Sequence, residues 1–343
     1  MEGGFYVLQH AVAPTRAGFM MLFVLTTSFD TTVDLIIRDM GTDGVFRYNF
    51  DLWRDYKLSL TPGGFRIEDP TGRVIESRTT TKFLLGKPWR SKDMFPGEDV
   101  GDEDRYYEEE MWYALREIAN LLWADGKIVL VEPLVDARVG KFVQLDAARD
   151  IFDVPTFQFS VGAPFEKAKG RDYVAKSLTF ETIGPESEGA TLFTTKVDTD
   201  QLSPGVPWFV QECITAETDV TVQVVRDEAF AFELDRRPFM DKTVDWRELA
   251  ADETSGEWQP HILPEDTEKK IFAFMDRLGL HFGRLDFLLG KGGYYFLEVN
   301  PSGQWGWLDV EGKHGLLNKV IKEISPATPC TPIPASPGPR AKF

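Results

Sequence analysis

The sequence has few of the residues that redox, zinc and nucleic-acid sites need. It contains two cysteines, Cys213 and Cys330, in 343 residues, so no disulfide framework can form and a reducing cytoplasm is the expected compartment. Its four histidines are scattered without the spacing of a zinc site. Positive charge is also scarce, and the net charge of −17 argues against non-specific nucleic-acid binding, which needs a positive field.

Two common phosphate-binding loops and long apolar runs are absent as well. Gly290-Lys291-Gly292 is followed by neither Ser nor Thr, and the Rossmann glycine pattern does not occur. The apolar run 17–25, after Arg16, is too short to cross a membrane and has no signal-peptide cleavage site after it. We therefore expect no membrane or nucleic-acid partner, and we interpret this run as the start of a buried first strand.

What the sequence does contain is a hairpin with polar side chains inside apolar strands. A glycine-rich turn separates the runs RLDFLL and YYFLEVN. If the turn centres on Gly292, Asp286 lies opposite Glu298, and Asn300 shares the face of Glu298. Two unpaired carboxylates among apolar neighbours would repel each other, and Mg²⁺, which prefers carboxylate oxygens and substrate phosphates, would relieve that repulsion. The alternative is an exposed hairpin with solvated acids, which fits less well because both acids interrupt apolar runs.

The remaining patterns predict a chain of several lobes. A helix is expected over 106–123, where apolar residues recur at helical spacing, followed by a short strand over 128–131. A second helix should run from Pro264 to Gly279, with Pro at its start and Gly just past its end. The expected segments are an N-terminal extension (1–19), an N-terminal α/β lobe (20–135), a central lobe (136–205), a C-terminal lobe (206–325) and a proline-rich disordered tail (326–343).

Other polar residues stand at the ends of apolar strands. Lys176 lies in the predicted strand 173–178 and precedes a glycine-containing turn, which suits a phosphate cradle because glycine lets backbone N–H groups approach phosphate oxygens. Without further context, the better interpretation of Lys176 is a lysine whose ammonium extends into solvent rather than one that binds phosphate. The strand ending at Glu212 could line an adenine ring, which needs apolar walls and a polar edge. Cys213 then reads as a wall residue, because no histidine is close in sequence.

The hairpin resembles the metal-binding end of the ATP-grasp superfamily. In that superfamily an Asp, a Glu and an Asn two residues later hold Mg²⁺ on the phosphates of ATP, and these match Asp286, Glu298 and Asn300. The following string NPSGQWGWL narrows the resemblance to the microviridin-type graspetide synthetases, which macrocyclise ribosomal precursor peptides. The resemblance covers about residues 21–320 and is most specific over 258–308.

The resemblance implies an ATP-grasp fold of the α/β (α+β) class, with ATP clamped between the central and C-terminal lobes. Arg247, in the string Asp-Trp-Arg, and Arg284 would hold the transferred phosphate or the substrate carboxylate, since a guanidinium pairs oxyanions bidentately. An ordinary surface ion pair is the alternative for Arg247, and a solvated lysine at a helix start is the alternative for Lys141. The implied nucleotide contacts are Lys141, Lys176, Glu212, Cys213 and Ile214.

One position departs from the family pattern. The family strand motif Asp-Ile/Val-Arg-Val has Thr221 here in place of the arginine, which is expected near the phosphates or the acyl phosphate. Arg226, Arg236 or Arg284 could replace its charge. The departure motivates one alternative of another class, a nucleotide-binding interaction protein with impaired turnover.

The function implied by the resemblance is ATP-dependent formation of side-chain esters or amides in a precursor peptide, through an acyl phosphate. The partners would be the leader and core of that peptide, with the leader recognised by the N-terminal and central lobes. The alternative enzyme is an ATP-grasp ligase that joins an amine to a carboxylate of another protein or small molecule. The precursor, the ring pattern and the choice of ester or amide stay open, and a homodimer is the expected state if the chain associates.

Overall fold

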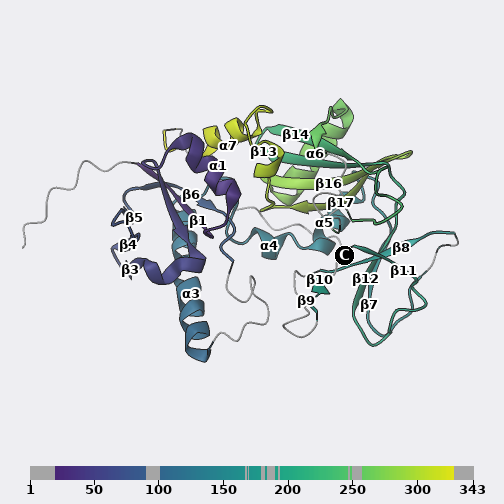
Figure 1. The fold of residues 1–343 in the computed structure, drawn as a ribbon, viewed down its shortest axis with the longest axis horizontal. Helices are drawn as coiled ribbons and strands as arrows, with labels where there is room; N and C mark the ends of the chain where they lie inside the picture. The colour runs from purple at the N-terminus through teal and green to yellow at the C-terminus, as the bar shows by residue number, and fades with distance from the viewer. Residues whose placement is uncertain are drawn as a thin grey trace, which may run out of the picture.

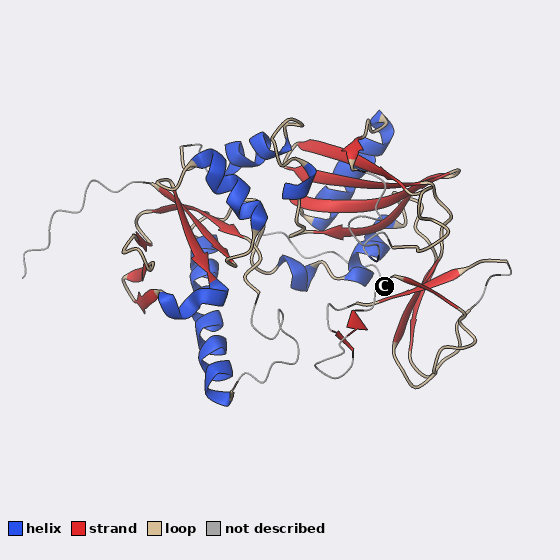
Figure 2. Ribbon diagram, in the orientation of Figure 1, coloured by secondary structure: helices blue, strands red, loops and turns tan. Residues whose placement is uncertain are grey.

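Three lobes follow one another along the chain (Figure 1). The computed structural model describes residues 20–89, 101–166, 168, 170–178, 182–183, 190–191, 194–245, 248 and 257–327. Figure 2 shows the N-terminal lobe at the left, the large C-terminal sheet at the upper right and the central sheet at the lower right. The predicted extension 1–19 and nearly all of the predicted tail 326–343 lie outside the described residues.

The N-terminal lobe is built around a short parallel sheet. Its first strand, β1, lies between β2 and β6, and a separate hairpin sheet has the order β3-β4-β5. The helix α3 covers 102–124 and so confirms the predicted helix. Asp30 caps α1 by accepting hydrogen bonds from the N–H groups of Thr32 and Val33. The elements are β1 (Met21–Thr26), α1 (Thr31–Met40), β2 (Val45–Asn49), η1 (Phe50–Asp55), β3 (Lys57–Thr61), β4 (Gly64–Glu68), β5 (Val74–Glu76), β6 (Thr80–Leu85) and α3 (Asp102–Ala124).

The predicted short strand over 128–131 is wrong. Only Ile128 pairs, in a single parallel bridge with Phe83. Leu130 has a φ of 66°, a left-handed conformation that interrupts an extended strand. The chain therefore turns here toward the central lobe, although its Val and Leu side chains are buried as those of a strand would be.

The central lobe contains a four-stranded antiparallel sheet with the order β11-β8-β12-β7. The strand β12 lies after residue 205, yet it pairs with β7 and β8 in this sheet. The strand β8 ends at Lys176 and so is shorter than the predicted 173–178. The elements are α4 (Val135–Arg138), α5 (Lys141–Ala148), β7 (Phe157–Ser160), β8 (Tyr173–Lys176), β9 (Thr182–Ile183), β10 (Ala190–Thr191), β11 (Thr195–Val197) and β12 (Trp208–Glu212).

The C-terminal lobe is an antiparallel sheet with the order β15-β14-β13-β16-β17. The helices α5 and α6 pack together, and α5 packs on β17. The helix α6 begins after Pro264 and ends at Gly279, whose φ of 63° is left-handed, as its sequence predicts. The elements are β13 (Thr218–Val225), β14 (Glu228–Asp235), β15 (Gln259–Pro260), α6 (Glu265–Leu278), β16 (Phe282–Gly290), β17 (Gly293–Asn300), η3 (Gly306–Leu308) and α7 (Leu316–Ile324).

The helix α7 joins the N- and C-terminal lobes. The helix α7 packs against α1, and the Lys82 ammonium on β6 donates to the backbone oxygen of Glu323 at 2.5 Å. Lys82 is 1% exposed, so this contact lies inside the junction of the N- and C-terminal lobes. Among the described residues, no helix has the length and apolar character needed to cross a bilayer.

Candidate functional site

The hairpin of β16 and β17 places Asp286 opposite Glu298 as predicted, but its turn pairs Gly290 with Gly293 and so does not centre on Gly292. Asp286 pairs with Glu298, and Arg284 pairs with Asn300. The register shifts just after Asp286, because Phe287 pairs with Phe296 and leaves Leu297 as an extra residue. This bulge places Phe296 in the core while Glu298 stays on the polar face beside Asp286.

The three predicted metal ligands lie together. The Asn300 amide donates to Asp286 Oδ2 at 3.3 Å and to Glu298 Oε1 at 3.4 Å. The side chains of Asp286 and Glu298 are 25% and 32% exposed, so they are neither sealed off nor fully solvated. No three acidic, histidine or cysteine side chains of the described residues form a metal-binding group, so the cluster depends on an amide as its third ligand.

The donor set of this cluster fits Mg²⁺. Two carboxylates and one amide offer hard oxygen atoms, which Mg²⁺ prefers, and leave room for phosphate oxygens and water. A half-turn of the Asn300 amide exchanges its N–H₂ group for its carbonyl oxygen at almost no steric cost. Asp286, Glu298 and Asn300 could therefore hold a Mg²⁺ ion between them.

Two cations border the cluster. Lys141, the first residue of α5, forms an ion pair with Glu298. Arg284 donates to both carboxylate oxygens of Asp286 at 3.3 Å and to the backbone oxygen of Gln304 at 2.8 Å. The structure thus brings Lys141 and Arg284, predicted from separate parts of the sequence, to one place, with positive charge beside the acids.

Thr221 lies at the centre of this group. It pairs with Asp286 across the sheet, is 1% exposed and donates its hydroxyl hydrogen to Asp286 Oδ1 at 2.7 Å. A threonine therefore orients the carboxylate at the position where the resembled strand motif has an arginine. Of the three arginines that could replace that charge, Arg284 lies beside Asp286, whereas Arg226 faces Glu323 and Arg236 faces Asp219.

The predicted nucleotide edge lies at the end of β12. The Glu212 carboxylate accepts a hydrogen bond from Thr156 Oγ1 at 2.8 Å and pairs with Arg171. The Cys213 N–H donates to the Asp172 oxygen at 2.8 Å, and burial raises the pKa of the Cys213 thiol, which fits a wall residue. The N–H of Ile214 donates to no group of the described chain. This backbone N–H is therefore the donor at the end of β12 that a ligand could use.

The other predicted site residues are Lys176 on β8 and Arg247 after β14. Lys176 is half-buried at the last position of β8, where it pairs with Phe209. Arg247 and the turn 184–189 lie outside the described residues. Asp245, two residues before Arg247, is 5% exposed and accepts from the Thr194 N–H at 3.2 Å.

A second polar group near the cluster was not predicted. Gln304 pairs with Thr32 and donates to Asp30 Oδ1 at 3.4 Å, so the segment after Asn300 contacts the N-terminal lobe. Lys87, just past β6, donates to Ser302 Oγ at 3.2 Å. The string NPSGQW marked one side of this contact, but no local pattern marks Lys87 because its partner is 215 positions away.

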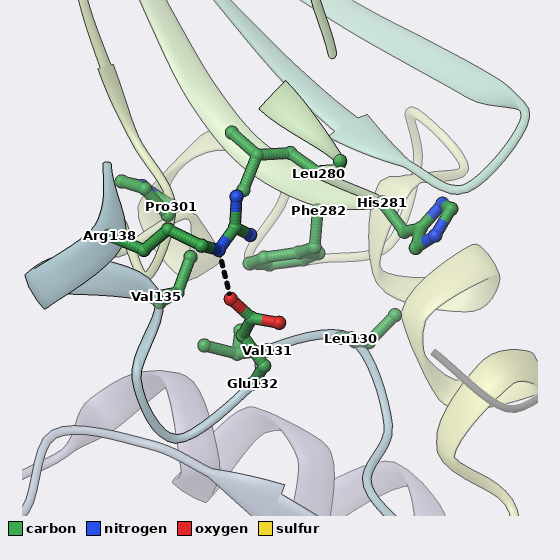
Figure 3. A pocket seen from close by; sticks show the side chains of 10 residues that line it. Leu130, Val131, Glu132, Val135, Arg138, Leu280, His281, Phe282 and Pro301 are labelled. Carbon is green, nitrogen blue, oxygen red and sulfur yellow. Dashed lines mark hydrogen bonds and ion pairs between the residues drawn. The ribbon is translucent and has the colours of Figure 1, made fainter. Parts of the chain in front are cut away.

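A small pocket lies beside the site, where the linker from the N-terminal lobe meets α6 and β16 (Figure 3). It has a volume of about 220 Å³, part of which is open solvent. Arg138 spans it, with Nε 2.7 Å from Glu132 Oε1 and Nη1 2.5 Å from the Leu278 oxygen. Apart from Pro301 it contains no residue next to the acidic cluster, so we interpret it as part of the lobe junction.

Comparison with known proteins finds likeness at the level of structure. No family model and no curated protein matches the sequence. A RiPP-associated ATP-grasp ligase of Chryseobacterium gregarium, in complex with ADP and a leader and core peptide, is 24% identical over 88% of this chain and 95% of its own, with a TM-score of 0.74. The macrocyclase MdnC of Microcystis aeruginosa, bound with the precursor peptide MdnA, is 23% identical over 89% and 99%, with a TM-score of 0.72.

A more distant structure shows the same architecture. The D-alanine–D-alanine ligase of Bacillus anthracis, complexed with ATP, is 14% identical over 89% of this chain and 97% of its own, with a TM-score of 0.52. The chain therefore has the ATP-grasp fold, and the fold class expected from the sequence is confirmed.

Proposed function

We propose that this protein is an ATP-dependent ligase that forms side-chain esters or amides within a ribosomally made precursor peptide. The observation that carries the proposal is the cluster of Asp286, Glu298 and Asn300, bordered by Lys141 and Arg284, on the sheet of an ATP-grasp fold. Two similar structures hold precursor or leader and core peptides, which supports a peptide as the substrate here.

Each side chain has a definite task in this proposal. Asp286, Glu298 and Asn300 hold Mg²⁺, which neutralises phosphate charge and acts as a Lewis acid. Lys141 and Lys176 bind phosphate oxygens, and the strand end at Glu212 to Ile214 binds the adenine edge. Arg284 and Arg247 stabilise the oxyanions of the transferred phosphoryl group.

The chemistry then needs two displacements. A carboxylate oxygen of a peptide Asp or Glu attacks the γ-phosphorus of ATP, the bond to the β–γ bridging oxygen breaks, and ADP leaves. A Ser or Thr hydroxyl or a Lys amine attacks the acyl carbon, the carbon–oxygen bond to phosphate breaks, and phosphate and a proton leave. The protein supplies position and charge, and no side chain forms a covalent intermediate.

The test is co-expression with a short acidic, Thr-rich peptide encoded beside this gene, followed by mass spectrometry. Ring formation removes one water per bond, so the peptide should lose successive waters while ADP is released. A gain of an amino-acid mass would support the carboxylate–amine ligase instead. ATP binding with an unmodified peptide and no ADP release would overturn the proposal in favour of an interaction protein.

Leader recognition by the N-terminal and central lobes gives a further expected result. A core peptide without its leader should be modified at least about tenfold more slowly at equal concentration, a difference of about 1.4 kcal/mol. Binding energy from the leader would position the core, and a leader supplied in trans should restore part of the rate. Equal rates for leaderless and full-length peptides would show that these lobes do not bind a leader.

Removing the Lys176 ammonium should weaken nucleotide binding. For Lys176→Ala we expect ATP affinity, measured by calorimetry, to fall by about tenfold, or about 1.4 kcal/mol, because a phosphate contact is lost. Lys196→Ala is the matched control, since Lys196 is exposed on the neighbouring strand β11 and pairs with Asp172 at 3.4 Å. Unchanged ATP affinity in both Lys176→Ala and Glu212→Ala would contradict the placement of ATP.

Thr221→Val tests the hydroxyl that stands in the arginine position. The change removes the donor to Asp286, and losing a hydrogen bond that orients a metal ligand should raise the Mg²⁺ concentration for half-maximal ADP release by about tenfold. Thr218→Val, on the opposite face of the same strand, should leave that concentration unchanged. If ADP release depended on Mg²⁺ concentration identically in wild type, Thr221→Val and Thr218→Val, the role given to Thr221 would be contradicted.

A further inference from the structure

Lys87 brings a positive charge from the N-terminal lobe to the segment that follows Asn300. It follows β6, and its ammonium donates to Ser302 Oγ at 3.2 Å. Ser302 is two residues after Asn300, and its hydroxyl lies 3.4 Å from both carboxylate oxygens of Asp136. The ammonium of Lys87 is therefore held between two lobes, at the edge of the proposed Mg²⁺ site.

The backbone around Lys87 is fixed by close packing. Its N–H donates to Thr26 Oγ1 at 3.2 Å, and that hydroxyl donates to Asp30 Oδ2 at 2.5 Å. A Cβ on the preceding Gly86 would lie 2.7 Å from Thr26 Oγ1 and 2.9 Å from Thr26 Cβ. Only glycine allows this approach, so the direction in which Lys87 leaves the strand is determined by the fold.

The charge of Lys87 differs from that of the other cations at the site. Lys141 and Arg284 each pair with a carboxylate of the cluster, whereas Lys87 forms no ion pair with any residue in the described part of the chain. Burial lowers the pKa of the Lys87 ammonium, the Asp136 carboxylate raises it, Arg284 lowers it, and the Asp30 carboxylate raises it. A partly desolvated ammonium that makes no direct ion pair is unfavourable, so an anion that contacts it would be stabilised.

The position of this charge indicates which anion it would meet. Lys87 approaches from the N-terminal lobe and Arg284 from β16, where Arg284 pairs with Asp286, and the two cations are close enough to repel each other. Thr221 supplies no charge there. We infer that Lys87 binds the side-chain carboxylate of the substrate peptide and the acyl phosphate that forms from it, an inference that rests on the proposed ligase activity.

In this role Lys87 keeps its proton throughout. When the carboxylate oxygen attacks the γ-phosphorus and ADP leaves, the ammonium stabilises the oxygen atoms of the new acyl phosphate. When the hydroxyl or amine then attacks the acyl carbon, the ammonium stabilises the departing phosphate. No bond to Lys87 forms or breaks, so the atom balance is that of the two displacements.

The first test detects the anion without needing turnover. Acetylphosphonate, a stable acyl-phosphate analogue, is added to the wild-type protein with Mg²⁺ and ADP, and lysine acetylation by an N-hydroxysuccinimide ester is followed by peptide mass spectrometry. The analogue should slow modification of Lys87 by about tenfold, the scale of about 1.4 kcal/mol of binding at near-saturation. The exposed Lys291 and Lys313 should react at unchanged rates. Equal rates at Lys87 with and without the analogue would overturn the inference.

The second test uses the peptide reaction. Lys87→Met should lower peptide-dependent ADP release at saturating ATP by about a hundred-fold, the scale of one lost electrostatic stabiliser, with ATP affinity unchanged. Lys87→Arg should recover part of the rate because its charge remains, and Lys291→Met should match wild type. If wild type itself releases no ADP, the proposed function fails while the acetylation result still decides the anion site. If wild type is active and Lys87→Met is equally active, the inference about Lys87 fails alone.

Discussion

Glu298→Gln is expected to lower peptide-dependent ADP release by about a hundred-fold or more, the scale seen when one electrostatic stabiliser is removed from an active site. Glutamine keeps the shape of the side chain but has one neutral oxygen in place of the carboxylate, so it binds Mg²⁺ weakly and leaves Lys141 without its partner. ADP release at saturating Mg²⁺ is the measurement, with circular dichroism to verify the fold.

Glu265→Gln is a suitable control for that variant. Glu265 is an exposed residue of α6 that pairs with Lys269, and such surface pairs contribute between about 0 and 1 kcal/mol. Its ADP release should equal that of wild type. If Glu298→Gln retained a near-normal rate, the assignment of Asp286, Glu298 and Asn300 as the metal ligands would be wrong.

Phe296→Ala is expected to lower the free energy of unfolding by about 3–5 kcal/mol, the range for losing a buried phenylalanine. Phe296 is 0% exposed, and its ring centroid lies 4.9 Å from that of Phe274, and 5.7 Å from those of Phe152 and Phe287. These rings join α6 and the loop after α5 to the hairpin that carries Glu298. A urea titration at fixed Mg²⁺ measures the change.

A matched truncation separates burial from loss of aromatic area. Phe159 is 46% exposed at the surface of β7, so Phe159→Ala should cost much less than Phe296→Ala. A similar cost for the two variants would contradict the view that the four-phenylalanine cluster supports the hairpin. Because the Phe296 ring lies beneath the site, Phe296→Ala should also weaken Mg²⁺-dependent turnover at temperatures where it is still folded.

The hairpin at the site was predictable because its information is local. Alternating side chains and a glycine turn predicted the hairpin and placed Asp286 near Glu298. The turn pairs Gly290 with Gly293, however, so the exact pairing of Asp286 with Glu298 depends on the bulge at Leu297, which the spacing did not predict. Lys87 and Thr32 could not be found in this way, because their partners Ser302 and Gln304 are brought near by the packing of separate lobes.

Side-chain partners at strand ends were harder to predict than the strands themselves. The strand ending at Glu212 formed as expected, yet Arg171 and Thr156 already bind its carboxylate. Among the described residues, the group of this polar edge that has no partner is the Ile214 N–H. The apolar composition of 128–131 predicted a strand. These residues are instead buried at a lobe junction, which requires the same apolar residue types. The left-handed backbone of Leu130 prevents an extended strand there.

The contact of α7 with α1 has a consequence for motion. The last helix of the described residues packs on the N-terminal lobe, and the Lys82 ammonium binds the Glu323 oxygen inside the junction. The N- and C-terminal lobes are thereby joined through α7, which favours their moving as one body. Under the proposed function, admission of ATP and release of ADP would then depend on rotation of the central sheet, whose described strands make no more than slight contact with α1 or α7.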